Sequence, residues 1–96
     1  MEDGVKEKAA KAKITIRPLA GWETGCKGFV LLLNESGLKI IEHRFVYPAV
    51  KKISEDTARR AVSEALKKMS VKKFDLAIKE QKSAPPGARF FLAEIR

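Results

Sequence analysis

Residues 54–69 read SEDTARRAVSEALKKM, and this stretch carries the clearest pattern in the 96-residue chain. Apolar side chains recur there at intervals of three and four residues, which places them on one face of an α-helix. They are Ala58, Ala61, Val62, Ala65, Leu66 and Met69. Ser54 is a favourable N-cap, and the acids that follow it complement the positive end of the helix dipole. Because the apolar face is rich in alanine, we predict a helix that packs closely against a sheet.

Three segments before the helix are predicted to be β-strands. Residues 14–20 begin with alternating apolar and polar side chains, and residues 29–33 form a continuous apolar run, as expected for a strand covered on both faces. Residues 34–37 (NESG) are a turn signal, so residues 38–47 should return as the antiparallel partner of the second strand. Pro18 cannot donate a ladder hydrogen bond, so the first strand should lie at a sheet edge or end there.

Two further strands are expected after the helix. Residues 71–80 alternate in polarity, residues 85–87 (PPG) form a rigid turn, and residues 89–95 close the chain. The predicted order is therefore βββαββ. We expect an α+β two-layer sandwich in which one helix covers one face of a five-stranded, mainly antiparallel sheet. Residues 14–96 are predicted to form this single domain, and residues 1–13 (MEDGVKEKAAKAK) are predicted to be a flexible polar leader.

Charge is the main functional signal in the sequence. Lys and Arg number 20 against 12 Asp and Glu, which gives a formal net charge of +8. Most of the excess belongs to the predicted domain and not to the leader, so we expect a basic surface on a folded unit. A basic surface of this kind indicates a polyanionic partner, and nucleic acid is the one that we favour.

The sequence offers little catalytic equipment. There is one histidine, His43, and one cysteine, Cys26, and neither belongs to a nucleophile triad or a metal-ligand spacing. We therefore expect no enzyme, no metal and no cofactor, and a structural or surface role for His43. The single cysteine rules out an intrachain disulfide and suits a reducing compartment, so a cytoplasmic location is expected. Asn34 and Gln81 are the only side-chain amides, which gives the chain a thermophile-like composition.

Two groups of cations are candidates for phosphate contacts. The first group lies on the helix and just beyond it, at Arg59, Arg60, Lys67, Lys68, Lys72 and Lys73. Each neutralised phosphate would release counterions and add affinity that does not depend on base sequence. The alternative is a solvated helix face whose charges form i,i+4 pairs, such as Glu64 with Arg60 and with Lys68.

The second group of cations follows the third predicted strand. Lys51 and Lys52 come after the segment HRFVY at residues 43–47, in which Arg44 and Tyr47 point to opposite faces of the strand. If the face that carries Tyr47 is open, its ring could stack on bases while Arg44 and the two lysines hold the backbone. The alternative is that the aromatic rings of this strand pack in the core, which is their commoner fate.

The loop at residues 21–28 (GWETGCKG) is rich in glycine. It lacks the spacing of a phosphate-binding loop and does not lead into a helix, so we reject a nucleotide site. Trp22, together with Lys27, is a candidate anchor for a protein partner, and the alternative is that Trp22 covers the sheet edge. Cys26 is expected to be exposed, with Lys27 lowering the pKa of its thiol.

The sequence thus favours a small basic module that binds nucleic acid, either DNA or RNA, or an accessory subunit of a nucleoprotein complex. Binding should be sensitive to salt and weakly specific, because phosphate contacts carry no base information. The alternative is a protein-interaction subunit that docks on a larger acidic partner through an exposed strand edge or Trp22, with charge steering the association. A homodimer formed by pairing of edge strands is a further alternative. Membrane attachment is not expected, because the apolar face of the helix is too small.

Overall fold

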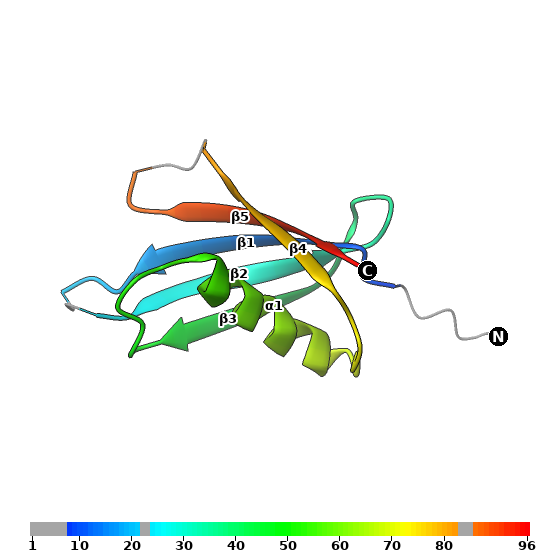
Figure 1. Ribbon diagram of the computed structural model, residues 1–96, viewed down its shortest axis with the longest axis horizontal. Helices are drawn as coiled ribbons and strands as arrows, with labels where there is room; N and C mark the ends of the chain where they lie inside the picture. Colours follow the sequence, from blue (N-terminus) through cyan, green and yellow to red (C-terminus); the bar gives the residue numbers. More distant parts are fainter. Residues whose placement is uncertain (1–7, 22–23, 83–85) are drawn as a thin grey trace.

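The computed structural model describes residues 8–21, 24–82 and 86–96. Its elements are β1 (Lys11–Pro18), β2 (Cys26–Leu33), β3 (Lys39–Tyr47), α1 (Glu55–Lys68), β4 (Leu76–Gln81) and β5 (Arg89–Ile95). The strands form one antiparallel sheet in the spatial order β3-β2-β1-β5-β4, and α1 lies across one of its faces (Figure 1). This confirms the predicted βββαββ order and the α+β two-layer sandwich.

The position of α1 follows from the sheet topology. β3 and β4 are the two edge strands, so the chain has to cross the sheet between them, and α1 makes this crossing in contact with β1, β2, β3 and β4. The helix begins as predicted, with the Ser54 N–H donating to Thr57 Oγ1 at 3.2 Å. One face of the sheet is therefore covered by α1, whereas no described helix or strand covers the other. In the described part of the chain, no helix has both the length and the apolarity needed to cross a bilayer.

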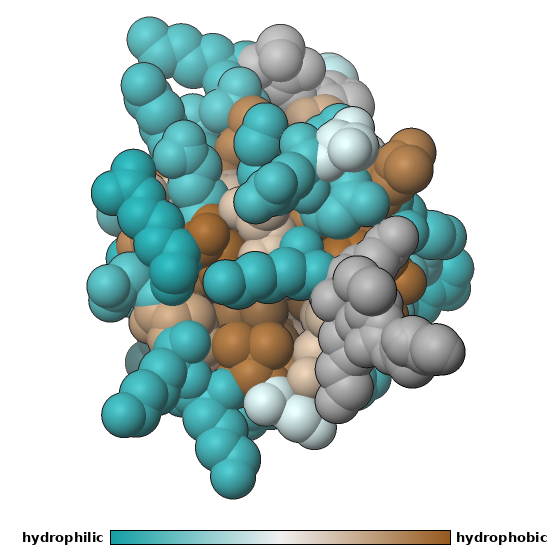
Figure 2. All heavy atoms as spheres, turned by 90° about the vertical axis from the view of Figure 1, so that its right-hand side faces the viewer, coloured by the Kyte–Doolittle hydropathy of each residue, from teal (hydrophilic) through white to brown (hydrophobic). Residues whose placement is uncertain are grey.

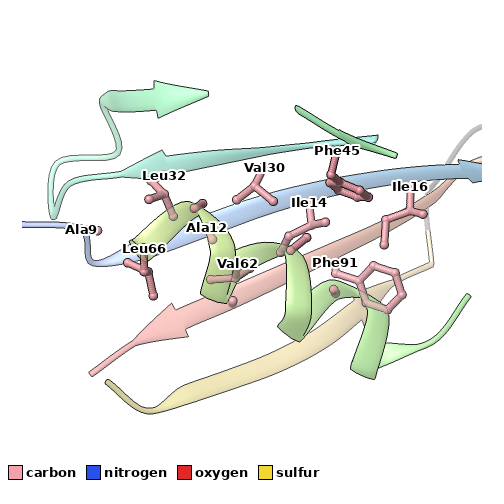
Figure 3. Close-up of a cluster of buried hydrophobic side chains, with 14 of the residues drawn as sticks. Ala9, Ala12, Ile14, Ile16, Val30, Leu32, Phe45, Val62, Leu66 and Phe91 are labelled. Carbon is pink, nitrogen blue, oxygen red and sulfur yellow. The ribbon is translucent and has the colours of Figure 1, made fainter. Parts of the chain in front are cut away.

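The core lies between α1 and the sheet. Figure 3 shows side chains from β1, β2 and β5, among them Ile14, Val30 and Phe91, gathered around Val62 and Leu66 of α1. The predicted apolar face of the helix is confirmed, because the following residues are all 0% exposed: Ala58, Ala61, Val62, Ala65 and Leu66. Its alanines leave little side-chain volume between the helix and the sheet, so the two layers approach closely.

Gly28 marks the tightest point of the sheet. A Cβ atom at this position would collide with the backbone carbonyl oxygen of Thr15, and it would lie 3.0 Å from Cζ of Phe45. The backbone of β2 can therefore take this path beside β1 only because Gly28 has no side chain.

β1 lies in the middle of the sheet, and the expectation of an edge strand is wrong. Pro18 is the last residue of the strand, so its missing N–H falls where the ladder ends, which was the other expectation. The strand begins at Lys11, three residues earlier than predicted, and the alanines Ala9 and Ala12 are buried. Residues 8–13 are therefore not part of a flexible leader. Their small alanines alternate with lysines, which gives a weak apolar signal for a strand.

The remaining strand boundaries shift by a few residues from the predictions. β2 begins at Cys26, inside the predicted loop, because its first residues pair with the end of β1. β4 begins at Leu76 instead of residue 71. The residues in between end the helix, where the Val71 N–H donates to Leu66 O at 3.0 Å, and return the chain to the sheet. Residues 1–7 of the predicted leader lie outside the described residues.

Candidate nucleic-acid interface

The cations predicted to contact phosphate are exposed, but the structure does not gather them into one surface. They are Arg44, Lys51, Lys52, Arg59, Arg60, Lys67, Lys68, Lys72 and Lys73. Lys51 and Lys52 precede α1, whereas Lys67 and the lysines after it lie at its far end. A helix of 14 residues is about 21 Å long. Arg44 lies on the other face of the sheet, away from α1.

The two arginines of α1 make contacts within the protein. Arg59 Nη1 donates to the Leu76 carbonyl oxygen of β4 at 3.4 Å. The guanidinium carbon of Arg60 lies 4.0 Å from the centroid of the Tyr47 ring, and its Nε is 3.8 Å from Glu64 Oε2. The Arg60–Glu64 pair confirms one of the i,i+4 pairs expected as the alternative. These arginines therefore tie α1 to the two edge strands.

The lysines at the end of α1 surround apolar surface. Lys67 and Lys72 line a small hollow together with Phe74, and Lys73 lines a neighbouring hollow of about 450 Å³. Figure 2 views the molecule from the right-hand side of Figure 1 and shows hydrophobic surface among protruding hydrophilic side chains. The structure thus brings these three lysines to one end of the molecule.

Tyr47 is not available to stack on a base, so this part of the site prediction is wrong. The ring is 5% exposed, faces α1 and stacks on Phe45 with the two centroids 4.7 Å apart. Its hydroxyl donates a hydrogen bond to the Glu64 carboxylate on α1. Burial, helped by this hydrogen bond, raises the pKa of Tyr47 far above its usual value. The alternative, in which the rings of β3 belong to the core, is the observed arrangement.

His43 belongs to the same buried layer under α1. It is 7% exposed, and its Nε2 lies 3.6 Å from Glu64 Oε1. Alternation along β3 places it on the side of Phe45 and Tyr47 and away from Arg44. Within residues 8–21, 24–82 and 86–96, no group of three or more His, Cys, Asp or Glu side chains is placed to hold a metal ion.

Cys26 is buried, contrary to prediction. It is 0% exposed, and burial raises the pKa of its thiol, whereas a lowered pKa was expected from Lys27. Both residues belong to β2, so their side chains point to opposite faces and the lysine is directed away from the thiol. Lys27 is exposed on the uncovered face. Trp22, the other residue predicted to anchor a partner, lies outside the described residues.

The sheet face opposite α1, here called the open face, combines aromatic, aliphatic and basic side chains. Strand alternation and register assign to it Glu42, Arg44 and Val46 of β3, Lys27, Phe29, Leu31 and Leu33 of β2, Lys11, Lys13, Thr15 and Arg17 of β1, Phe90, Leu92 and Glu94 of β5, and Ala77, Lys79 and Gln81 of β4. Cations clearly outnumber carboxylates in this set. Both carboxylates also lie near an arginine, with Arg44 Nε 2.9 Å from Glu42 and Arg96 Nη2 3.5 Å from Glu94.

One row across the open face carries two phenylalanines. Phe29 of β2 and Phe90 of β5 both pair with Thr15 of the central strand, so their Cα atoms are two strand spacings, about 10 Å, apart. Arg44 and Gln81 continue the row onto the edge strands. Both phenylalanines are only partly buried, and the residue between them, Thr15, has a smaller side chain than either.

Cations flank this row on both sides. On one side, Arg17 of β1 pairs with Lys27 of β2. On the other side, Leu92 of β5 pairs with Lys13 of β1 and with Lys79 of β4. Side chains on one face recur every second residue, so each of these lines is about 7 Å from the aromatic row. The two rings therefore lie between one line that holds two cations and another in which two lysines alternate with leucines, with Glu42 at its β3 end.

A hollow of about 570 Å³ opens on the open face beside this row. Leu33 and Leu92 line it together with Lys11, Lys13 and Lys79, and the polar side chains Gln81 and Glu94 line it as well. Leu92 is 41% exposed although it is a large apolar residue. Phe90 lies two residues from Leu92 on the same strand, and Lys13 and Lys79 pair with Leu92 from either side, so this part of the open face combines exposed apolar surface with cations.

Sequence reasoning identified only Arg44 and Lys27 among the residues of the open face. The signal that could have revealed the others is alternation: residues 11–17 place Lys, Lys, Thr and Arg on one face, and residues 27–31 place Lys, Phe and Leu there. This signal was lost because residues 11–13 were assigned to the leader and residues 26–28 to a loop.

No protein-family model, curated protein or solved structure matches this chain, so its function has to be inferred from the residues and the geometry described above.

Proposed function

We propose that this protein is a small, non-catalytic module that binds nucleic acid, alone or as the basic subunit of a nucleoprotein complex, and that the open face is its contact surface. The observation that carries the proposal is the row Phe29–Thr15–Phe90, which no described element covers and which cations border on both sides. Lys and Arg neutralise phosphates, and aromatic faces take bases. Nucleic acid is the polyanion that uses both kinds of group.

Binding through this surface should depend strongly on salt and weakly on base sequence. Each contact between a cation and a phosphate releases counterions, so affinity falls as salt concentration rises. Phosphate contacts fix the position of the ligand without reading its bases. Lys67 and Lys68 lie in the last turn of α1, and Lys72 and Lys73 follow the helix, so none of the four belongs to the open face. In this proposal they attract the ligand by long-range electrostatics instead of contacting it. A cytoplasmic location fits the proposal, because the chain has one cysteine and hence no intrachain disulfide to maintain.

Fluorescence anisotropy with labelled single- and double-stranded DNA and RNA at two salt concentrations tests the proposal. One variant reverses three charges on the open face, at Lys13, Arg17 and Lys27, each replaced by Glu. Its matched control reverses three charges at the end of α1, at Lys67, Lys68 and Lys72, and so has the same net charge. We expect the open-face variant to lose binding and the control to keep most of it.

The outcomes separate the surface from the function. Loss of binding in the control alone would move the interface to the end of α1 and leave nucleic acid as the ligand. If the unmodified protein binds none of these ligands even at low salt, the proposed function is wrong.

A protein-interaction role is the second candidate, and β3 is the observation that favours it. Among the described strands, this strand of nine residues pairs with β2 alone, so the backbone groups on its other side can pair with a strand of another chain. Val46 on the same strand is 59% exposed. The geometry also suits a homodimer. A sedimentation coefficient that rises with protein concentration would support the homodimer, and a constant value would contradict it.

A further inference from the structure

We propose further that the ligand of the open face is a single-stranded polynucleotide, that two of its bases stack on Phe29 and Phe90, and that a neighbouring base enters the hollow beside Leu92. This inference rests on the proposed function and names the class of nucleic acid. It is carried by the spacing of the two rings, the apolar hollow next to them and the sign of the surrounding charge.

The two rings are placed as separate stacking platforms. The Cα atoms of Phe29 and Phe90 are about 10 Å apart, because one strand lies between theirs. Each ring is only partly buried, whereas Phe45 and Phe91 on the opposite face are 6% and 1% exposed. Aromatic side chains attract bases of any kind, because every base has a π-face to stack.

Stacking of this kind requires unpaired bases. In a regular duplex the faces of the bases are stacked on one another, so rings projecting from a sheet reach those faces only where a base step is unstacked at an energetic cost. An unpaired strand can turn its bases outward, onto the rings, while its phosphates meet the flanking cations. Lys27 and Arg17 lie on one side of the row, and Lys13 and Lys79 lie on the other.

The hollow supplies a third place for a base. Its volume of about 570 Å³ is within the range of pockets that take small organic ligands, roughly 300–1,000 Å³. Leu92, which is 41% exposed, offers apolar surface to the base, and the lining lysines Lys11, Lys13 and Lys79 supply positive charge for the neighbouring phosphates. An apolar hollow lined by lysines suits a flat group attached to an anionic chain.

Charge also argues against a second copy of this chain as the occupant. Two open faces brought together would oppose the same cations across the contact, and juxtaposed like charges cost several kcal/mol. A polyanion meets the same side chains with opposite charge. The strand is therefore the partner that the surface complements.

The test compares three ligands of equal length: a single strand, the duplex of the same sequence, and a single strand of abasic sugar-phosphate units. The abasic strand keeps the phosphates and lacks the bases. The variants are Phe29→Ala, Phe90→Ala and Lys13→Ala. Leu38→Ala is the matched control, because Leu38 is an apolar residue that is 63% exposed and lies between β2 and β3, outside the open face. Phe90→Tyr keeps an aromatic ring in place, and the circular dichroism and denaturation midpoint of each variant report its fold.

We expect the single strand to bind at least about tenfold more tightly than the duplex or the abasic strand, as one to three stacked bases would give. Each Phe→Ala change should weaken binding of the base-bearing strand by about 5- to 150-fold, and should leave binding of the abasic strand unchanged. Lys13→Ala should weaken binding of both strands and reduce the salt slope by about 0.7. Leu38→Ala and Phe90→Tyr should bind like the unmodified protein.

Two results would overturn the inference while leaving the proposed function in place. One is equal affinity for the single strand and the duplex, and the other is a Phe29→Ala, Phe90→Ala double variant that binds as tightly as the unmodified protein. A concentration-dependent dimer that this double variant dissolves would assign the open face to a second copy and also overturn it. Absence of binding to every ligand would instead remove the proposed function itself.

Discussion

The two faces of the sheet are built from the same strands, yet their side chains differ in kind. Toward α1, β1 presents Ala12, Ile14 and Ile16, all of them buried. Toward the open face, the same strand presents two lysines, a threonine and an arginine. β5 shows the contrast in adjacent residues, since Phe91 is 1% exposed under α1 whereas Phe90 is only partly buried on the other face.

The contrast between the covered face and the open face separates the residues that stabilise the fold from those that do not. Contact with α1 explains the apolar residues of the covered face, because burying them stabilises the two layers. The apolar residues of the open face have no such layer among the described elements, and they lie beside cations that a core would exclude. The fold alone does not account for Phe29, Phe90 and Leu92, and the ligand proposed above would account for them.

The adjacent phenylalanines of β5 test most directly whether the two faces contribute differently to stability, and they give the largest expected effect. Phe91→Ala should lower the free energy of unfolding by about 3–5 kcal/mol, because it leaves a cavity under α1. Phe90→Ala should cost about 1 kcal/mol, because only part of its ring is removed from water. Urea denaturation of both variants measures the two costs. Equal costs would show that the open face is as much a part of the core as the covered face.

Gly28 tests how tightly the covered face is packed. Gly28→Ala should lower the free energy of unfolding by about 1–3 kcal/mol, because the new methyl group meets the Thr15 carbonyl oxygen and Phe45 and forces the strands to shift. Gly37→Asn is the control, since nothing lies within 4 Å of a Cβ there and asparagine tolerates the positive φ of this turn. Thermal unfolding compares the variants. A Gly28→Ala protein as stable as the control would contradict the packing described for β1 and β2.

The covered face could be predicted from the sequence because its signals are local. The helix was identified from the spacing of Ala58, Ala61 and Leu66, and the strands from short apolar runs between turn residues. The position of β1 in the middle of the sheet was not predictable in this way. It depends on pairing with β5, which lies more than seventy residues away along the chain, and on Ala9 and Ala12 packing under the helix.

The candidate site was predicted poorly because the spacing of charged residues along the sequence does not show which of them share a surface. The cations near α1 stand out in the sequence as clusters, but Arg59 and Arg60 are used in contacts within the protein. The cations of the open face come from four different strands and converge only through the sheet register. Tyr47 and Cys26 were misplaced for a related reason, since alternation shows that two neighbours face opposite ways without showing which face is covered.

Tyr47 and Arg44 allow polar groups on the two faces to be compared, with a smaller expected change in stability. Tyr47→Phe should lower the free energy of unfolding by about 1 kcal/mol, through loss of the hydrogen bond to Glu64. Arg44→Ala on the open face should change it by less than about 0.5 kcal/mol, since that side chain is 84% exposed and its pair with Glu42 is solvated. Denaturation at neutral pH measures both. A larger cost for Arg44→Ala than for Tyr47→Phe would reverse the roles assigned to the two faces.

The pair of Glu80 on β4 and Arg89 on β5 should give the smallest effect, and its dependence on pH identifies it. Arg89 donates to both carboxylate oxygens of Glu80, at 2.6 and 2.5 Å, and this hydrogen bonding lowers the pKa of Glu80 below its ordinary value of 4.5. The ionised carboxylate therefore favours the folded state, with a contribution that is complete above pH 4.5 and is lost as the pH falls through the lower pKa of the folded protein. Glu80→Gln has no such titration, so its deficit in stability at pH 7 should be small and should vanish in acid. Urea denaturation from neutral to acidic pH measures this, and a deficit that grew on acidification would contradict it. A small effect even for this well-aligned pair means that exposed charge contributes little to the fold. The stability of the sheet then does not explain the cations of the open face, which is why we propose a polyanionic ligand for them.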